Sequence, residues 1–531
     1  MHATLMSRTW GREITTTVVN GYPCRVYQDR PRSVAALLQD ASRWCGRTFA
    51  VEGGRRLSFD DFAHAVGRVA SHLEARGVRR GDRVILLAYN SLEWLAAFWA
   101  LQSLGAVTVL ANAWWSPAEI AEGLADVSPA AVVADQLAKR GLQGRADAID
   151  LQELRAVVDA TDVPEPRTLP LVDEDEVAII MFSSGTSGRA KGVLMSHRGV
   201  VANIQNLLAL TGRMPHELPP DSQGTVSLLT VPLFHLAGIQ TSFSTLLSGG
   251  TLVLLQGRFD PGAVLRLIES ERVRVWGSIP TMVSRVLEYP ELDQYDTSSL
   301  RSIPMGGAAI SPELRQKVQR AFPGVKKSVG SLFGSTEAGG VLAAGSADDL
   351  QGRSGCVGKP LPVVELRIRH PDANGVGEIL ARTPTATLGC WGDPSPTTDV
   401  DGWVATGDLG RIEDGYLILS GRSKDIVIRA GENVACAHVE QCLQRHPAVV
   451  EVAVLPLPHA DLGEEVAAVV VLRAGAAVTE QELEAHASAS LGRFQVPSSW
   501  WLRAEPLPTN ASGKIAKREL LALWTARERT S

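Results

Sequence analysis

Hydrophobic positions along the chain switch repeatedly between helical spacing and short unbroken runs. Apolar residues recur at helical spacing in residues 58–76, 91–104 and 261–271, and Ser58 is placed to cap the first of these helices. Short runs rich in branched apolar residues predict strands at 83–87, 106–110, 131–134, 177–182, 251–255 and 273–278. This order of strands and helices predicts an α/β fold with largely parallel sheets.

The pattern changes after Gly389. Turn signals that favour hairpins punctuate the chain there, at Asp401-Gly402, Glu413-Asp414-Gly415 and Ser420-Gly421. The chain beyond residue 422 predicts helices at 437–445, 479–491 and 514–526, with strands at 449–455 and 465–472. This α+β pattern is long enough for a small domain. We therefore expect an N-terminal domain at 1–421, a hinge at 422–425 and a C-terminal domain at 426–531.

Composition and charge narrow the class of protein. The 531 residues are 45% hydrophobic and 21% charged, which is typical of a soluble globular protein too long for one core. The net charge of -6 argues against nucleic acid as a partner. The six cysteines form no CxxC pair, so a zinc site is not expected. Residues 1–11 contain no apolar signal segment, and we expect a cytoplasmic location.

One uncharged stretch is long enough to span a bilayer. It covers the 22 residues from Trp94 to Trp115. Polar residues and a glycine interrupt it, including Gln102, Gly105 and Asn112. We interpret it as a buried helix that ends at a Gly105 cap and is followed by a strand, so no transmembrane segment is expected.

A glycine-rich loop is the first candidate for chemistry. Residues 183–192 read SSGTSGRAKG and follow a predicted strand. Glycines let consecutive backbone N–H groups converge on an anion, hydroxyls add donors, and Lys191 adds a positive charge. The spacing differs from the Walker pattern, because no Ser or Thr follows Lys191. A flexible Ser/Gly linker is the alternative, but a linker rarely lies between two apolar runs.

Six further segments complete a recognisable set. They are PLFHLAG at 232–238, MGGA at 305–308, FGSTE at 333–337, WVATGD at 403–408, GRSKD at 421–425 and LPTNASGKI at 507–515. In this order they resemble the motifs of the adenylate-forming superfamily, which includes acyl-CoA synthetases, peptide-synthetase adenylation domains and firefly-type luciferases. The resemblance implies a large N-terminal domain of two α/β sheets and a distorted β-barrel, with a small mobile α+β C-terminal domain.

The resemblance also implies a nucleotide site. Phe333 and Gly334 would lie against adenine, with Gly307 and Ala308 along the base and the acyl carbonyl. Thr336 would contact the α-phosphate, and Glu337 would ligate Mg²⁺, which prefers oxygen ligands. Asp408 and Arg422 would bind the ribose. The pyrophosphate would be held by the loop residues Ser183, Ser184, Gly185, Thr186, Ser187, Gly188 and Lys191.

The remaining implied roles concern the acyl group and coenzyme A. The acyl pocket would be walled by Phe234, His235, Gly238, Trp276 and Gly306. Lys424 would be the pivot of the hinge, and Gly431 and Glu432 would line a tunnel for coenzyme A. Lys514 would be the lysine that assists adenylation.

These roles imply two half-reactions. A substrate carboxylate attacks the α-phosphorus of ATP to give acyl-AMP and pyrophosphate, assisted by Lys514, Glu337, Thr336 and Lys191. The small domain then turns about Lys424, and the thiol of coenzyme A attacks the acyl-AMP carbonyl. The expected cofactors are therefore ATP, Mg²⁺ and coenzyme A.

The identity of the acid is only bounded by the sequence. No acidic residue lies between Asp221 and Asp260, so a substrate ammonium group would find no partner there. This favours a neutral, largely apolar acyl chain, as in a fatty, aryl or polycyclic acid.

Several alternatives stay open. A carrier-protein thiol could replace coenzyme A, and a homodimer is equally compatible with the sequence. Departures from the family pattern include Ser187, Ala190, Phe333, Ile428 and Ala430, so a variant that performs one half-reaction is a further alternative. An inactive nucleotide-binding or interaction module is the third hypothesis. The full set of Lys191, Glu337, Asp408, Arg422 and Lys514 argues against it.

Overall fold

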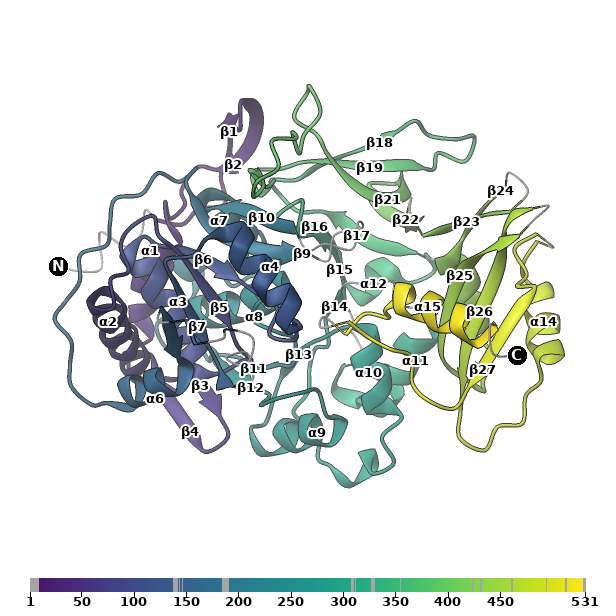
Figure 1. The fold of residues 1–531 in the computed structure, drawn as a ribbon, viewed down its shortest axis with the longest axis horizontal. Coiled ribbons are helices and arrows are strands. Elements are labelled where there is room, and N and C mark those ends of the chain that lie inside the picture. The colour runs from purple at the N-terminus through teal and green to yellow at the C-terminus, as the bar shows by residue number, and fades with distance from the viewer. Residues whose placement is uncertain are drawn as a thin grey trace.

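Three sheets and a separate C-terminal sheet organise the molecule (Figure 1). The computed structural model describes residues 9–136, 142, 144–145, 147–183, 191–306, 310, 312–325, 330–353, 355–422, 425–429, 432–459, 462–492, 494–510 and 513–528. Within these ranges, none of the helices is long and apolar enough to cross a membrane.

The first sheet carries the predicted phosphate loop. Its order is β20-β10-β9-β6-β5-β7-β8, and the strands from β9 to β8 run parallel. The strands are β5 (Arg83–Leu87), β6 (Val107–Leu110), β7 (Ala131–Ala134), β8 (Ala148–Asp150), β9 (Val177–Ser183), β10 (Lys191–Ser196) and β20 (Gly389–Cys390). Parallel strands place their carboxyl ends on one edge, so the chain that follows β5, β6 and β9 lies on the same side.

The second sheet is also mainly parallel. Its order is β13-β11-β12-β3-β4, with only β4 antiparallel. The strands are β3 (Thr48–Glu52), β4 (Arg55–Ser58), β11 (Val226–Leu229), β12 (Thr251–Leu254) and β13 (Val275–Gly277). One core cluster joins residues of both sheets and of the helices between them.

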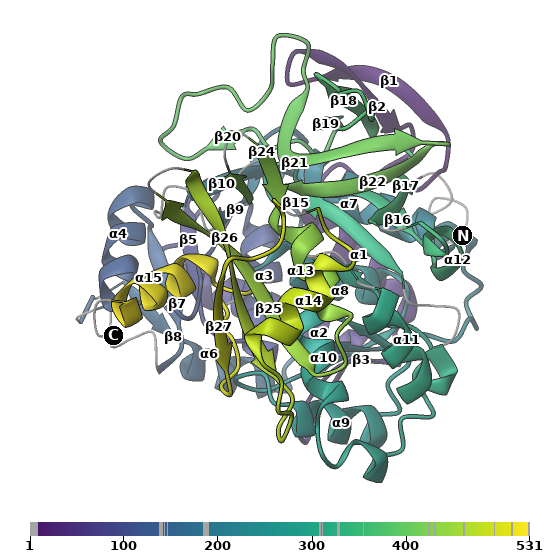
Figure 2. The ribbon, with the colours of Figure 1, turned by 90° about the vertical axis from the view of Figure 1, so that its right-hand side faces the viewer.

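The third sheet has eight strands and is antiparallel except between β14 and β15. Its strands, in spatial order, are β14 (Met305–Gly306), β15 (Ser331–Ser335), β16 (Gly340–Gly345), β17 (Cys356–Pro360), β22 (Tyr416–Arg422), β21 (Val404–Glu413), β19 (Gly377–Arg382) and β18 (Glu365–Arg369). A hairpin of β1 (Ile14–Val19) and β2 (Tyr22–Tyr27) lies beside β18 and β19 (Figures 1 and 2). The third sheet and this hairpin form the all-β region of the N-terminal part, which corresponds to the distorted β-barrel that the resemblance implied.

Eleven α-helices belong to the described part of the chain before Arg422. They are α1 (Val34–Ala41), α2 (Phe59–Ala75), α3 (Leu92–Leu104), α4 (Pro117–Val127), α6 (Leu151–Asp159), α7 (His197–Leu210), α8 (Leu236–Leu247), α9 (Pro261–Ser270), α10 (Pro280–Leu287), α11 (Pro312–Ala321) and α12 (Ala347–Leu350).

The uncharged stretch of the sequence is a buried helix and a strand, as expected. Every residue of α3 is buried, and Ser91 caps its first turn. Gly105 ends it in the left-handed conformation, and β6 follows two residues later. Ser58 likewise caps α2 through a capping box with Asp61.

The C-terminal sheet is built around its own core. Its strands run in the order β24-β23-β26-β25, and β27 adds to β26. The elements are β23 (Ile426–Arg429), β24 (Glu432–Ala435), α13 (Cys436–Gln444), β25 (Val449–His459), β26 (Gly463–Leu472), α14 (Glu480–Ser488), β27 (Ser499–Arg503) and α15 (Lys517–Glu528). Two hydrophobic clusters draw only on residues beyond 426. In Figure 2 this small unit lies in front of the rest of the chain.

One predicted turn is instead part of a strand. Ser420-Gly421 was expected to end a strand, but both residues lie inside β22. Leu409 pairs with Gly421 and Gly410 pairs with Leu419, so Ser420 is the extra residue of a β-bulge. The turn at Asp414-Gly415 does join β21 to β22, and both of its residues have positive φ.

Candidate functional site

The predicted phosphate loop joins two antiparallel strands at the edge of the first sheet. Ser183 ends β9 and pairs with Lys191, the first residue of β10. Ser184, Gly185, Thr186, Ser187 and Gly188 lie outside the described residues, and so does Ala190. Because β9 runs parallel to β6 and β5, Ser183 at the end of β9 lies at the carboxyl edge of the sheet, where α/β proteins bind ligands.

Lys191 and Glu337 approach the same small group of residues. The Nζ of Lys191 lies 3.3 Å from Oδ2 of Asp393, and about half of the lysine side chain is exposed. Hydrogen bonds from Ser395 and Lys191 lower the pKa of Asp393 to about 2. Burial raises the pKa of the Cys390 thiol, and the charges of Lys191, Asp393 and Glu337 also act on it. The predicted phosphate lysine and the predicted metal carboxylate therefore lie near one another.

A tight turn presents Thr336 and Glu337 after β15. Gly339 closes the turn with φ +70, and its N–H donates to the Thr336 carbonyl at 2.9 Å. A Cβ at Gly339 would collide with the Thr385 carbonyl, so the position requires glycine for space as well as conformation. The Glu337 side chain is exposed, while its backbone carbonyl accepts from Thr387 at 3.4 Å.

The two predicted ribose residues face each other across a β-ladder. Asp408 in β21 pairs with Arg422 in β22. The Asp408 side chain is 6% exposed, and its N–H donates to Thr406 Oγ1 at 3.2 Å. Pairing across adjacent strands brings the two residues close together, although they are separate in the sequence.

The predicted adenine residues occupy the start of the third sheet. Phe333 lies in β15, is 7% exposed and packs in a core cluster with Val341 and Ala343. Gly334 is exposed, and Gly306 of β14 pairs with Leu332 of β15. Gly307 and Ala308 lie outside the described residues. Stacking of Phe333 on a base stays a prediction.

The predicted acyl wall lies at the start of α8. His235 is the N-cap residue of α8, and its ring lies 4.7 Å from that of Phe234, which is buried. A Cβ at Gly238 would collide with the Pro232 carbonyl, so the loop and helix approach closely. The Trp276 ring is fully buried, and its Nε1 donates to Thr230 Oγ1 at 3.0 Å.

The charge of Lys514 acts on His235, although His235 lies in the second-sheet region and Lys514 lies near the C-terminus. Burial and then the positive charge of Lys514 lower the pKa of His235 to about 4, so its ring is neutral at pH 7. The Nε2 atom of His235 is buried, and no hydrogen-bond partner for it lies among the described residues. Because the His235 ring is uncharged, it adds no positive charge to that of Lys514.

The loop that carries Lys514 docks on the large part of the molecule. Asn510 holds the loop closed, because its Oδ1 accepts from Lys514 N and its N–H donates to the Lys514 carbonyl. The Gly513 carbonyl accepts a 2.6 Å hydrogen bond from Thr281 Oγ1 of α10. Gly513 has φ +74, and a Cβ there would lie 2.5 Å from Ile279 Cδ1. In Figure 1 the yellow segment before α15 reaches toward β14 and α10.

The predicted hinge and tunnel are described only in part. Arg422 ends β22, and Asp425 precedes β23, whereas Lys424 and Gly431 lie outside the described residues. Glu432 begins β24 and pairs with Arg429 of β23. The roles assigned to these positions stay predictions.

The donor set at Glu337 fits Mg²⁺. Within the part of the chain that the structure describes, no cluster of three acidic, His or Cys side chains could hold a metal by itself. One exposed carboxylate suits Mg²⁺, which usually keeps several waters and binds one or two carboxylates together with substrate phosphates. Glu337 would hold the ion, which would supply positive charge to the phosphates.

The sequence did not indicate which residues bind the predicted site residues and position them. Asp393 pairs with Lys191, and Thr281 and Ile279 receive the Lys514 loop. Lys517 binds both carboxylate oxygens of Asp425 at 2.8 Å and lies 2.7 Å from Glu440. None of these carries a recognisable local pattern, because each acts through a contact between distant segments.

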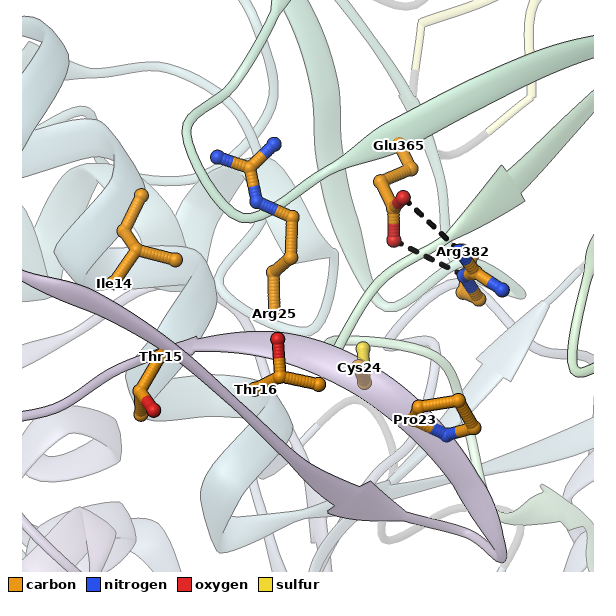
Figure 3. A pocket seen from close by; sticks show the side chains of 8 residues that line it. All are labelled: Ile14, Thr15, Thr16, Pro23, Cys24, Arg25, Glu365 and Arg382. Atoms are coloured by element: carbon orange, nitrogen blue, oxygen red, sulfur yellow. Dashed lines mark hydrogen bonds and ion pairs between the residues drawn. The ribbon is translucent and has the colours of Figure 1, made fainter.

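A polar cavity lies away from this site, under the N-terminal hairpin (Figure 3). It measures about 430 Å³, and its lining includes Thr16, Cys24, Arg25, Glu365 and Arg382. Figure 3 shows the bidentate pair of Glu365 and Arg382 on its far side from Thr16. Burial raises the pKa of the Cys24 thiol to about 12, so this cysteine is not a nucleophile near neutral pH. None of the sequence-predicted site residues lines the cavity.

Two family models match the chain. The model described as AMP-binding enzyme matches residues 37–391. The model described as AMP-binding enzyme C-terminal domain matches residues 438–514. The first match includes every strand from β3 to β20. The second match runs from within α13 to Lys514.

Known relatives are similar over nearly their full length. A feruloyl-CoA synthase of Amycolatopsis sp is 34% identical over 479 residues, covering 88% of this chain and 94% of the relative. A long-chain-fatty-acid–CoA ligase of Bacillus subtilis (strain 168) is 27% identical over 553 residues, covering 94% and 96%. The crystal structure of ATP-bound MatB from Rhodopseudomonas palustris superposes with TM-score 0.81 at 27% identity, covering 92% and 99%.

Proposed function

The chain belongs to the AMP-binding enzyme family and is an AMP-forming acid–coenzyme A ligase that uses ATP and Mg²⁺, and from this premise we propose that the acyl chain of its acid is uncharged and largely apolar. The proposed reaction converts acid, ATP and coenzyme A to acyl-CoA, AMP and pyrophosphate. The observation that carries it is the docking of the C-terminal loop on α10, where the Gly513 carbonyl accepts from Thr281 and the charge of Lys514 acts on His235 of the predicted acyl wall.

The first half-reaction forms acyl-AMP. A carboxylate oxygen attacks the α-phosphorus of ATP, the bond from that phosphorus to the bridging oxygen breaks, and pyrophosphate leaves. No base is required, because a carboxylic acid is already ionised near neutral pH. Lys514 stabilises the charge that develops on the α-phosphate, with Thr336 beside it. Lys191 and the loop at 183–188 hold the pyrophosphate, and the Lys191 ammonium, which pairs with Asp393, is exposed enough to reach it.

The second half-reaction transfers the acyl group. The thiol sulfur of coenzyme A attacks the acyl carbonyl, the carbon–oxygen bond to AMP breaks, and the thiol proton passes to solvent. The small domain turns at a hinge of residues 422–425, with Lys424 as its pivot, and brings Gly431 and Glu432 to the thiol. The separate hydrophobic clusters on either side of this hinge support a boundary between domains at 1–421 and 426–531.

The preference for a neutral acid rests on the charges near α8. No acidic residue lies between Asp221 and Asp260, and the lowered pKa of His235 keeps its ring uncharged. An ammonium group on the substrate would therefore find no carboxylate in this segment and would lie near the cation of Lys514. The names of the relatives, with feruloyl and long-chain fatty acyl groups, span aryl and aliphatic members of this class.

A panel of acids tests the proposal. Enzyme, ATP and Mg²⁺ are incubated with ferulate, cinnamate, octanoate, palmitate or phenylalanine, with and without coenzyme A. Mass spectrometry then measures AMP, acyl-AMP and acyl-CoA. We expect acyl-AMP from a neutral acid and acyl-CoA once coenzyme A is added. Activity with phenylalanine alone would contradict the proposed substrate class.

The same panel separates the alternative acceptor. A carrier protein with its phosphopantetheine arm replaces coenzyme A in a parallel set of reactions. Acyl transfer to the carrier protein without acyl-CoA formation would identify a carrier-protein ligase. Acyl-AMP that accumulates with either thiol would identify a variant that retains only the first half-reaction.

A further inference from the structure

One face of α10 carries the contacts to the small unit. Thr281, Arg285 and Glu288 are spaced i, i+4 and i+7, so they form one stripe that includes the residue after the helix. Each of the three contacts a residue beyond 450. The buried residues of the helix are Met282, Val283 and Val286, which belong to the core of the large unit, and Met282 also lies beside Gly513. The helix thus joins the two bodies.

Arg285 binds the start of the segment that leads to Lys514. Its Nε lies 3.2 Å from Oε1 of Glu451, and its Nη2 lies 3.4 Å from the Leu507 carbonyl. The other oxygen of Glu451 accepts a 2.6 Å hydrogen bond from Leu507 N. The Glu451 side chain is only 7% exposed, so loss of the arginine would leave a nearly buried carboxylate with less compensation.

Thr281 binds the other end of the same segment. Its hydroxyl donates to the Gly513 carbonyl, one residue before Lys514. The side chain of Ile279, the N-cap residue of α10, packs against Gly513. The segment from Leu507 to Gly513 is therefore held at both ends by one helix face, and Lys514 follows directly.

Two exposed ion pairs also join the two units, outside the segment from Leu507 to Gly513. Arg473 reaches both carboxylate oxygens of Glu288, at 2.7 and 3.2 Å, and Arg445 lies 3.7 Å from Glu313 of α11. Nearly half of each arginine side chain is exposed, so each pair contributes little to stability by itself. Their placement guides the docking of the small unit without holding it tightly.

We propose that the outward face of α10, with Thr281 and Arg285 as positioning residues, is a latch that holds Lys514 at the acyl site for acyl-AMP formation only. The proposal rests on the proposed function. Every latch contact joins the large and the small unit, so all of them must break when the small unit turns for thiol transfer. Weakening the latch lowers the population of the state that forms acyl-AMP and leaves the thiol-transfer state untouched.

Two variants and a control test the latch. Thr281→Val removes one hydroxyl, Arg285→Ala removes the guanidinium, and Arg272→Ala removes a guanidinium whose partner is Asp296 within the large unit. The panel acid with the highest rate is used. The rate of acyl-AMP formation is measured from the pyrophosphate released. The rate of thiol transfer is measured separately, starting from pre-formed acyl-AMP of the same acid and coenzyme A.

We expect the two half-reactions to separate. Acyl-AMP formation should fall about threefold to tenfold in Thr281→Val and about tenfold or more in Arg285→Ala. Thiol transfer from pre-formed acyl-AMP should stay within about twofold of wild type or rise, because the latch is absent from that state. Arg272→Ala should change neither rate. A parallel fall of both half-reactions in Thr281→Val would overturn the latch, since general damage to the fold acts on both.

Hydrogen exchange provides a readout that needs no acid. In the latched state Leu507 N is bonded to the nearly buried Glu451 carboxylate, so its exchange is slow. Peptides that cover 505–516 should exchange faster in Thr281→Val and Arg285→Ala than in wild type, while peptides within α3 stay unchanged. Unchanged exchange at 505–516 would also overturn the latch. If wild-type enzyme forms no acyl-AMP with any acid, the proposed function fails, and the exchange result still decides the latch.

Discussion

His235 shows how a distant residue changes the chemistry of a side chain. Its ring lies at the N-terminus of α8, where burial and the charge of Lys514 keep it neutral. A protonated imidazole would add a second positive charge next to Lys514. As a neutral ring, His235 gives the predicted acyl wall a polar but uncharged side chain, which is compatible with an uncharged acyl group.

The lowered pKa of His235 predicts a pH dependence of stability. The unfolded chain binds a proton at this residue below about pH 6.5, whereas the folded chain does so only near pH 4. The free energy of unfolding should therefore decrease as pH falls from 6.5 toward 4, by at most about 1.4 kcal/mol per pH unit from this residue. Thermal unfolding across this range measures the slope.

His197 supplies the internal comparison for that measurement. Burial also lowers its pKa to about 4, and its Nδ1 accepts from Val34 N. His235→Gln should remove one contribution and leave the other, so the slope becomes shallower without vanishing. A slope that His235→Gln leaves unchanged would show that His235 titrates normally in the folded protein.

Lys514 should be needed for one half-reaction. Lys514→Ala should lower acyl-AMP formation by about 100-fold to 1000-fold, because it removes the charge that faces the developing negative charge. Thiol transfer from pre-formed acyl-AMP should persist. Lys359→Ala is the control, since Lys359 lies over the Tyr416 ring and is exposed. Acyl-AMP formation at the wild-type rate in Lys514→Ala would exclude the role.

At the scale of secondary-structure elements, Lys517 connects three pieces of the small unit. It begins α15, and its ammonium binds Asp425, which precedes β23, and Glu440 of α13. Burial alone would lower the pKa of Lys517, but the charges of Glu440 and Asp425 outweigh it and raise that pKa. The start of α15, just after the loop with Lys514, is thus tied to the last residue of the predicted hinge.

Lys517→Met should therefore destabilise the small unit. Without the ammonium, the carboxylates of Asp425 and Glu440 lose their shared cation, and each is less than a third exposed. This loss should lower the free energy of unfolding by about 1.5–3 kcal/mol. Chemical denaturation measures the loss. Adding Asp425→Asn and Glu440→Gln should recover part of it, because the two negative charges are then gone. A single variant as stable as wild type would show that solvent screens the cluster.

At the scale of the whole molecule, the chain crosses between two bodies once near its end. β22 ends at Arg422 in the third sheet, and β23 begins at Ile426 in the C-terminal sheet. Among the described residues, the contacts between the bodies are a few ion pairs, the docked loop and the packing of α13 and β24 against β22, and none of the hydrophobic clusters spans both bodies. An interface of this kind permits the two bodies to separate and turn.

Restricting the hinge should stop the cycle after its first step. Lys424→Pro fixes φ at this position, so the turn that thiol transfer requires should be blocked. We expect acyl-AMP formation to continue while acyl-CoA formation falls by about tenfold or more. Single-turnover mass spectrometry measures both products, and Lys424→Ala is the control for loss of the charge. Intact acyl-CoA formation in Lys424→Pro would count against a hinge at this residue.

The sequence predicted much of the fold because the signals were local. The helix α2 begins at the expected Ser58 cap, α3 lies within the expected range, and the strands β5 and β7 have the expected bounds. The sequence did not indicate β27, since Ser499–Arg503 lacks alternation and becomes a strand only by pairing with β26. Similarly, Ser420 became a bulge because β21 dictates the register of β22.

By itself the sequence determined the family, the order of the motifs and the residue types of the site, because the spacing within each motif is a local property. Tertiary structure alone decided which motifs meet. It docked the Lys514 loop on α10, paired Asp408 with Arg422, and gave Lys191 the partner Asp393. It also decided that one face of α10 receives the C-terminal loop. The reason is physical: pKa values and contacts depend on groups that only folding brings within a few ångströms.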